Sequence, residues 1–262
     1  MPNPASQTVP AIDMRNVTVG ALHDPSTTSV EGVNWTVQAG EFWVIGGLHG
    51  SGKTDFLSLT AGLIGGLTGE YRMFGRLMPI PQGDSLEDRL RVGLVFDGGQ
   101  MIRSLSVRQN VSLPLCYHRE LEPVEAEEKV QAMLKWTGLE EVADSHHDVV
   151  SGSVRKRVGL ARALIMQPDL VVIDNPLGNL DRRETAWWLR FLRELSVGTG
   201  SRAGRAATVI VSAGDLGPWR GVATHFAVLK ARRLLTVGTA AELGAQSDPA
   251  VQELISEALI IS

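Results

Sequence analysis

Eight consecutive residues have the types and spacing that bind phosphate groups: Gly47, Leu48, His49, Gly50, Ser51, Gly52, Lys53 and Thr54. Glycines let the backbone curl until successive N–H groups point inward at an anion. In this pattern the lysine reaches the outer phosphates of a nucleoside triphosphate, and the hydroxyl of the last residue ligates Mg²⁺. We therefore predict that this phosphate loop, together with Asp55, binds a nucleotide.

The segments on either side of the phosphate loop support this prediction. A short apolar run at residues 42–45 precedes the loop and predicts a strand, and residues 54–63 have helical spacing. A strand, a glycine-rich turn and a helix form the context that the pattern requires. The N-terminus of the helix adds partial positive charge where the anion would lie.

A second candidate group follows another apolar run. Residues 170–173 predict a buried strand, and Asp174 comes directly after it. An apolar strand that ends in aspartate is the usual partner of a phosphate loop, and its carboxylate holds Mg²⁺. The sequence therefore predicts a Mg²⁺ site made by Thr54 and Asp174.

The composition is that of an ordinary globular protein of 262 residues, 44% of them apolar and 21% charged. Because the net charge is −4, no overall basic field indicates a nucleic-acid partner, and we predict none. Short basic runs at residues 155–157 and 182–183 are interpreted as solvated helix faces. The lone Cys116 excludes a disulfide framework and a cysteine-based metal site.

Two further observations concern location. No apolar run reaches the roughly 18 residues of a membrane span, and residues 1–10 lack a basic stretch followed by an apolar one. We therefore expect a cytoplasmic protein that associates with a membrane only through a partner.

Apolar patterning predicts an α/β fold. Alternation favours strands at residues 12–19 and 33–37, separated by a break at residues 24–28, and these strands predict a small antiparallel layer. Residues 97–157 are mostly helical in pattern, with helices at 106–115 and 122–137. Fully apolar runs predict buried parallel strands, and residues 198–204 predict a surface loop; the runs are residues 92–96, 170–173, 207–211 and 225–229.

Two later segments resemble those of a known family. Residues 150–164, which begin Val-Ser-Gly-Ser-Val-Arg-Lys-Arg, resemble the signature motif and following helix of ABC transporter ATPases. Residues 168–181, Pro-Asp-Leu-Val-Val-Ile-Asp-Asn-Pro-Leu-Gly-Asn-Leu-Asp, resemble their Walker B motif and D-loop. The order phosphate loop, helical insert, signature, Walker B and D-loop is specific to that family, and the resemblance covers nearly the whole chain.

The resemblance implies a P-loop NTPase fold with a RecA-like core and an inserted helical subdomain. We expect one ABC ATPase domain over residues 1–262, with the core at about 11–96 and 159–240, the helical subdomain at about 97–158 and a helical tail at about 241–262. It also implies ATP and Mg²⁺ as cofactors and a transmembrane permease as partner. Two subunits, identical or different, would pair head to tail, so that Ser151, Gly152 and Ser153 of one face the ATP of the other.

Within the family, residues 110–115 and 248–255 look most like the Mla/Mce-type lipid transport ATPases. This narrower resemblance implies a lipid as the transported substrate. It rests on these two short segments.

Several positions depart from the pattern of the family. Asn175 stands where the family has the glutamate that orients or deprotonates the attacking water, and an amide cannot take that proton. Gly214 aligns with the switch histidine, and Asp97 aligns with the Q-loop glutamine. Asp97 would still ligate Mg²⁺, and the nearby Gln100 is a candidate substitute for the missing glutamine.

Smaller departures affect the edges of the site. In the signature, Ser153 and Val154 replace the usual glycine and glutamine, so we expect a looser fit to the partner's ATP. The aromatic residue that usually stacks on adenine aligns near Ala21, and His23 is the nearest substitute. Two pairs are interpreted as structural: Trp187 and Trp188 as core, and His146 and His147 as loop.

The residues for binding are thus present and those for hydrolysis are replaced. Loss of a general base typically costs about 10²- to 10⁴-fold in rate. The sequence favours an ATP-binding subunit with impaired hydrolysis that drives or regulates a permease. Two alternatives stay open: a working ATPase that pairs with itself, and a non-catalytic regulatory partner in a heterodimer.

Overall fold

A six-stranded sheet forms the centre of the computed structural model, which describes residues 9–79, 86–199 and 204–256. Its order is β10-β9-β3-β8-β7-β6, with β9, β3, β8, β7 and β6 parallel and β10 antiparallel at the edge. The strands are β3 (Phe42–Gly46), β6 (Val92–Val95), β7 (Leu170–Ile173), β8 (Thr208–Ala213), β9 (His225–Lys230) and β10 (Arg233–Thr239).

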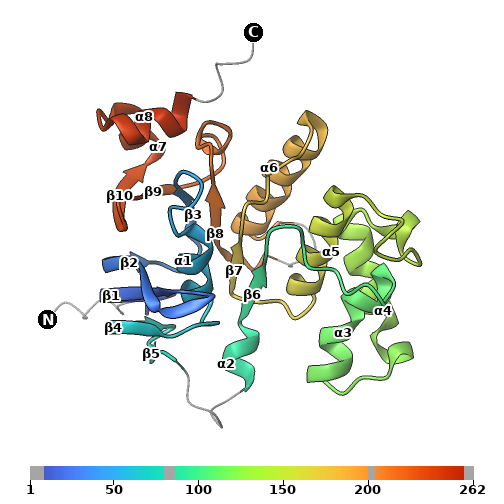
Figure 1. Ribbon diagram of the computed structural model, residues 1–262. Coiled ribbons are helices and arrows are strands. Elements are labelled where there is room, and N and C mark those ends of the chain that lie inside the picture. The colour runs from blue at the N-terminus through green and yellow to red at the C-terminus, as the bar shows by residue number, and fades with distance from the viewer. Residues whose placement is uncertain (1–8, 80–85, 200–203, 257–262) are drawn as a thin grey trace, which may run out of the picture.

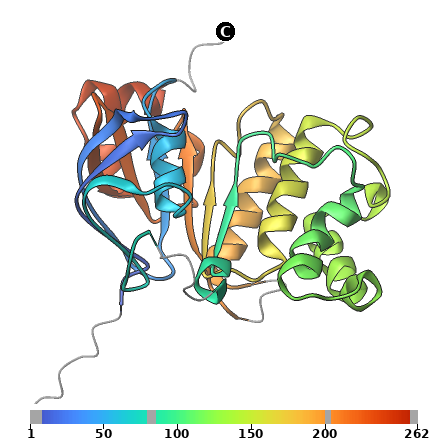
Figure 2. The same cartoon turned by 60° about the horizontal axis from the view of Figure 1, so that its bottom comes forward.

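A second, antiparallel sheet has the order β2-β1-β4-β5. Its strands are β1 (Ile12–Ala21), β2 (Asp24–Val37), β4 (Gly66–Met73) and β5 (Arg76–Leu77). Figures 1 and 2 show this sheet on one side of the molecule and the helices of the middle of the chain on the other, with the central sheet between them.

The helices divide between these regions. Helix α1 (Lys53–Thr60) lies between the two sheets, and the chain between β6 and β7 is largely helical. The remaining helices are α2 (Leu86–Leu90), α3 (Val107–His118), α4 (Pro123–Thr137), α5 (Gly152–Leu164), α6 (Arg182–Val197), α7 (Ala240–Ala245) and α8 (Pro249–Ser256), with short 3-10 turns η1 (Glu140–Val142) and η3 (Gly217–Trp219). Within the described residues, no helix is long and apolar enough to cross a membrane.

Two apolar cores hold these layers together, one on each face of the central sheet. Successive residues of β3 alternate between them, with Phe42 and Val44 in the core beneath the helices and Trp43 and Ile45 in the core between the sheets. Because both faces are covered, every residue of β3 is buried, which explains its continuous apolar run.

The predicted α/β fold, with its mostly parallel sheet and antiparallel layer, is confirmed, but two local predictions are wrong. Residues 24–28 do not break the chain between strands, because the turn is confined to Leu22 and His23 and β2 begins at Asp24. Strand β6 lies at the sheet edge and is only half-buried, although its sequence is as apolar as that of a central strand.

The predicted domain boundaries stay predictions, and parts of them lie outside the described residues. These parts are residues 1–8 of the N-terminal segment, 200–203 of the loop predicted at 198–204, and 257–262 of the helical tail. The helical pattern after residue 97 corresponds to α3, α4, η1 and α5.

Candidate functional site

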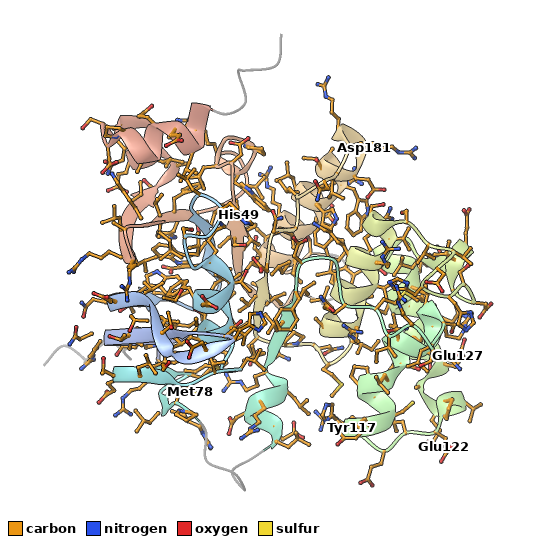
Figure 3. All side chains as sticks on the ribbon, in the orientation of Figure 1. His49, Met78, Tyr117, Glu122, Glu127 and Asp181 are labelled. Carbon is orange, nitrogen blue, oxygen red and sulfur yellow. The ribbon has the colours of Figure 1, made fainter. Side chains whose placement is uncertain are left out.

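The phosphate loop joins β3 to α1 and lines a cavity of about 620 Å³, here named the phosphate-loop cavity. Figure 3 labels His49 on this loop. The cavity brings together residues from several strand ends: Ser29, Gly47, Leu48, His49, Gly50, Gly52, Lys53, Thr54, Asp55, Asp97, Asp174, Asn175 and Gly214.

Two glycines give the loop its shape. Gly52 has a φ of 90°, which L-residues rarely adopt, and a Cβ there would collide with the Ser29 hydroxyl. A Cβ on Gly47 would collide with the Ser51 hydroxyl. Glycine at both positions therefore lets the loop pack closely against Ser29 and Ser51.

Lys53 bends back over the loop. Its Nζ donates to the carbonyl oxygens of Gly47 at 2.7 Å and Leu48 at 2.8 Å. Burial lowers the pKa of the Lys53 ammonium below its usual value, and attraction to the Asp174 carboxylate offsets part of that effect. An anion in the cavity would stabilise the charged form of this lysine.

The predicted Mg²⁺ residues contact each other directly. The Thr54 hydroxyl donates to Oδ2 of Asp174 at 2.6 Å, and the Ser212 hydroxyl donates to Oδ1. Ser212 also accepts from the backbone N–H of Asn175 at 2.9 Å. Asp174 lines the cavity and is only 7% exposed, and among the described residues its carboxylate accepts side-chain hydrogen bonds from these two hydroxyl groups.

Asp55 connects the loop to the antiparallel sheet. Its two carboxylate oxygens accept from the N–H of Leu22 at 2.8 Å and from the Ser29 hydroxyl at 2.6 Å. It borders the cavity, but its hydrogen bonds fix the turn between β1 and β2 against α1.

A second cavity of about 630 Å³, here named the signature cavity, lies between the start of α5 and the start of α6. The predicted residues Ser151, Gly152 and Ser153 line it, so this chain keeps them in a different cavity from the phosphate loop. The Ser151 hydroxyl caps α5 by accepting from Val154 N at 3.3 Å and lies 2.9 Å from the Ser153 hydroxyl. Figure 3 labels Asp181, also in this lining, at the start of α6.

Asp97 lies at the border of the two cavities and lines both. Its Oδ2 accepts from Nδ2 of Asn175 at 3.1 Å, and its Oδ1 pairs with Nζ of Lys156 at 3.0 Å. Lys156 Nζ also donates to the carbonyl oxygens of Asn175 and Gly178, each at 2.8 Å.

The interpretation of residues 155–157 as a solvated face is wrong. Lys156 is 7% exposed because it faces Asp97 and two carbonyl groups, and Arg157 pairs with Glu184 at 2.6 Å. Arg182 and Arg183 are exposed, as predicted.

Other candidate residues have different surroundings. Gln100 is exposed and lines neither cavity, and His23 is exposed at the turn before β2. Trp188 is fully buried in the core, as predicted. Among the described residues no group of His, Cys, Asp or Glu has the arrangement of a metal site made by those residue types. His146 and His147 lie in the segment between η1 and α5.

Sequence reasoning missed Ser29, Ser212 and Lys156. No local pattern marks them, because each gains its importance from a partner far along the chain. The two glycines Gly99 and Gly159 were also missed: a Cβ on either would collide with backbone atoms of the other segment, so the loop after β6 lies directly on α5.

The residues that line the phosphate-loop cavity fit a nucleotide with bound Mg²⁺. The Ser51 hydroxyl is buried and has no hydrogen-bond partner in the described part of the chain. A glycine cradle, a lysine and one unsatisfied hydroxyl suit a polyphosphate, and a hydroxyl beside a carboxylate suits a hard cation such as Mg²⁺.

Comparison with known proteins agrees with this arrangement. Residues 30–178 match the family described as ABC transporter. The chain is 29% identical to the methionine import ATP-binding protein MetN 2 of Rhodococcus jostii over 88% of its length, and 31% identical to the sulfate/thiosulfate import ATP-binding protein CysA of Methylococcus capsulatus over 89%. It is 32% identical over 79% of its length to the macrolide export ATP-binding/permease protein MacB of Nitrosomonas europaea.

The chain spans only part of these relatives, 67% of MetN 2, 64% of CysA and 31% of MacB. Among solved structures, cbiO1 of Clostridium perfringens, part of an ABC transporter complex, has a TM-score of 0.76 at 23% identity, covering 91% of this chain and 92% of that one, which shows the shared fold. The ATP-binding cassette MJ0796, a dimer bound to ADP and Pi, has a TM-score of 0.74 at 26% identity, covering 85% and 96%. The family match spans more than half of the chain, and the chain therefore belongs to the ABC transporter family.

Proposed function

We propose that this chain is the ATP-binding subunit of a membrane transporter and that it binds MgATP with impaired hydrolysis. The observation that carries the proposal is the Thr54–Asp174 hydrogen bond of 2.6 Å at the bottom of a cavity lined by the phosphate loop. In the proposed complex the backbone amides of the phosphate loop and Lys53 hold the phosphates, and Thr54 and Asp174 hold Mg²⁺. Asp97 borders the same cavity, but its two carboxylate oxygens face Asn175 and Lys156, so a contact with the metal would require it to leave one of them.

We propose that a second subunit is needed to enclose the bound ATP. The signature residues Ser151, Gly152 and Ser153 line a cavity separate from the phosphate loop of their own chain, so they are available to a nucleotide held by another subunit. The dimeric state of MJ0796 supports pairing of this kind. We propose a dimer, with identical or different subunits, on the inner face of a cell membrane beside a permease.

Two residues support impaired hydrolysis. Asn175 borders the cavity with an amide that cannot accept a proton from water at neutral pH, and Gly214 offers no side chain there. The substitution at position 175 acts on the chemical step and leaves the phosphate-binding residues intact.

A second candidate is a fully active ATPase, favoured by the intact Lys53, Thr54 and Asp174. The functions of the relatives, import of methionine or of sulfate and thiosulfate and export of macrolides, support transport but differ in cargo and direction. A lipid cargo is a separate proposal that rests on residues 110–115 and 248–255. In this structure Asn110 is fully buried and its NH₂ group donates to carbonyl groups in the segment that precedes α3, which is a structural task.

The test is MgATP affinity measured beside ATP turnover on the purified chain. Tight binding with turnover about 10²-fold or more below that of an intact ABC subunit is the expected result. Lys53→Ala is the baseline variant and should abolish both. Undetectable binding by the unmodified chain contradicts the proposal, and turnover at the rate of an intact subunit supports the active alternative. For the cargo, a permease reconstituted with this chain would be offered labelled phospholipid, methionine and sulfate in parallel.

A further inference from the structure

Three residues from distant parts of the chain form one connected group beside the phosphate-loop cavity. Asp97 follows β6, Asn175 follows β7, and Lys156 lies in α5. The Asp97 carboxylate accepts from the Asn175 amide at 3.1 Å with one oxygen and pairs with Lys156 at 3.0 Å with the other. Asp97 and Asn175 both line the cavity that contains Lys53, Thr54 and Asp174.

The chemistry of the pair determines which way the amide faces. An ionised carboxylate only accepts hydrogen bonds, so the group that faces Asp97 must be the NH₂ of Asn175. The amide oxygen, Oδ1, is then on the other arm of the side chain. It accepts no hydrogen bond from any residue that the structure describes.

The backbone also favours this placement. Asn175 has a φ of 47°, a conformation that asparagine tolerates better than most residues. A Cβ on Gly178 would collide with the amide, so the glycine at that position makes room for it. Lys156 Nζ donates to the carbonyl oxygens of both residues and so fixes the segment that carries the amide.

We propose that Asp97 is a positioning residue that holds Asn175 so that its amide oxygen accepts a hydrogen bond from the water that attacks the γ-phosphate. The inference deepens the proposed function and rests on it. A hydrogen bond from NH₂ to a carboxylate polarises the amide and makes its oxygen a stronger acceptor, because linked hydrogen bonds reinforce one another. The negative charge thus acts through the amide, and Lys156 keeps that charge in place.

The reaction balances without a protein base. The water oxygen forms a bond to the γ-phosphorus, and the bond from that phosphorus to the bridging oxygen breaks, with its electron pair leaving on ADP. Because an amide takes no proton, the proton of the water ends on the released phosphate. Orientation of the water is then the contribution of Asn175, a role that glutamine side chains perform in other phosphate-loop enzymes.

Asp97 and Asn175 must therefore be changed together to raise the rate of ATP turnover. In Asn175→Glu alone, the new carboxylate lies beside Asp97, and two like charges at this distance repel each other and displace both side chains. In Asp97→Gln with Asn175→Glu, the carboxylate and the amide exchange places. The glutamine NH₂ can then donate to a glutamate that is able to accept the proton of the water.

The experiment measures kcat, KM and MgATP affinity for the unmodified chain, Asp97→Asn, Asn175→Glu, Asp97→Gln and the double variant. Asp97→Asn should lower kcat about 10-fold while affinity changes less than about 3-fold, since orientation acts on the chemical step. The kcat of Asn175→Glu should stay within about 3-fold of that of the unmodified chain. The kcat of the double variant should exceed that of the unmodified chain at least about 10-fold.

Asp169→Asn is the matched control. It removes a carboxylate that lies just before β7, at the end of the strand opposite Asn175, and that pairs with Arg91 and Arg205. All kinetic constants of this variant should stay unchanged. Thermal unfolding of each variant shows whether it is folded. A double variant no faster than Asn175→Glu overturns the inference, whatever the rate of the unmodified chain, and so does an unchanged kcat in Asp97→Asn. Loss of MgATP binding by the unmodified chain would instead overturn the proposed function.

Discussion

The strands β6 and β7 carry charged residues at both ends, and the two ends differ in how the charges are compensated. Before the strands, Asp169 accepts from Arg91 at 2.6 Å and pairs with Arg205. After them, Asp174 accepts from two hydroxyl groups and forms no ion pair within the described part of the chain. At the first end Asp169 is paired with two arginines. At the second end Asp97 is paired with Lys156, but the buried Asp174 forms no ion pair among the described residues and attracts Lys53 only from a longer distance.

This difference separates a structural cluster from a binding site. A buried charge without a partner costs free energy, and proteins keep one where a ligand supplies the missing charge. Lys53 could supply it but is 2.7 and 2.8 Å from two loop carbonyls instead. Removing the Asp169 carboxylate should therefore lower stability and leave MgATP affinity unchanged. Removing the Asp174 carboxylate should lower MgATP affinity without lowering stability.

Of the changes at the two ends of these strands, Asp174→Asn is expected to give the largest effect on MgATP binding. MgATP affinity should fall about 100-fold or more, since even the loss of an outer-shell partner typically costs about 10- to 100-fold in metal affinity. The melting temperature without nucleotide should stay equal or rise, because the variant removes an uncompensated charge. Titration with and without Mg²⁺, beside a thermal melt, measures both. A large fall in melting temperature with intact affinity would show that the carboxylate is structural.

The next largest effect concerns the loop after β6, whose backbone lies on α5. Gly99→Ala should lower the free energy of unfolding by roughly 3 kcal/mol or more, because the new Cβ collides with the backbone carbonyl of Arg155. Gly98→Ala is a matched control: its φ of 76° is nearly the 75° of Gly99, but a Cβ there meets nothing within 4 Å. The control should cost only about 1 kcal/mol.

Denaturant unfolding of the two glycine variants gives the comparison. Equal losses would mean that backbone conformation alone sets the cost and that the close approach to α5 contributes nothing. A larger loss in Gly99→Ala would show that the close approach of this loop to α5 contributes to the stability of the fold.

What the sequence predicted about the site depends on how far apart the interacting residues are. The phosphate loop and Asp174 could be predicted because strand, turn and helix are local patterns. The Asp97–Asn175 hydrogen bond joins residues 78 positions apart, and no local pattern encodes it. Lys156 was misjudged because a run of three basic residues looks solvated, whereas the fold places one of the three against Asp97. The fold class followed from apolar runs, but an apolar run does not distinguish the edge strand β6 from a central one.

Asp169→Asn tests the first end of these strands, where the carboxylate is paired with arginines. Burial would raise the pKa of the Asp169 carboxyl, but hydrogen bonds from Arg91 and Arg205 outweigh this effect and hold the pKa below its usual value. The unmodified chain should be more stable than the variant by about 1 kcal/mol near neutral pH, a modest figure because the cluster is partly exposed to solvent. MgATP affinity should not change.

The sign of the pH dependence follows from the lowered pKa. A carboxyl whose folded-state pKa is depressed contributes stability that is fully present above its unfolded value of about 3.9 and is lost as the pH falls through the folded-state pKa. The difference between the unmodified chain and Asp169→Asn should therefore be constant from about pH 7 to 5 and shrink below about pH 4. A difference that grows on acidification would contradict the assignment of Asp169 as an ionised, paired group.

The smallest effect is expected at Gly214, which lines the phosphate-loop cavity. A Cβ there meets nothing within 4 Å, so Gly214→His should change the free energy of unfolding by no more than about 0.5 kcal/mol. Gly93 in β6 is the contrasting position, because a Cβ there would lie 3.1 Å from Pro168 and 3.2 Å from the carbonyl oxygen of Ala163. A methyl group at Gly93 should therefore cost more stability than an imidazole at Gly214. If the order is reversed, the carboxyl ends of these strands do not have the free space that a nucleotide would need.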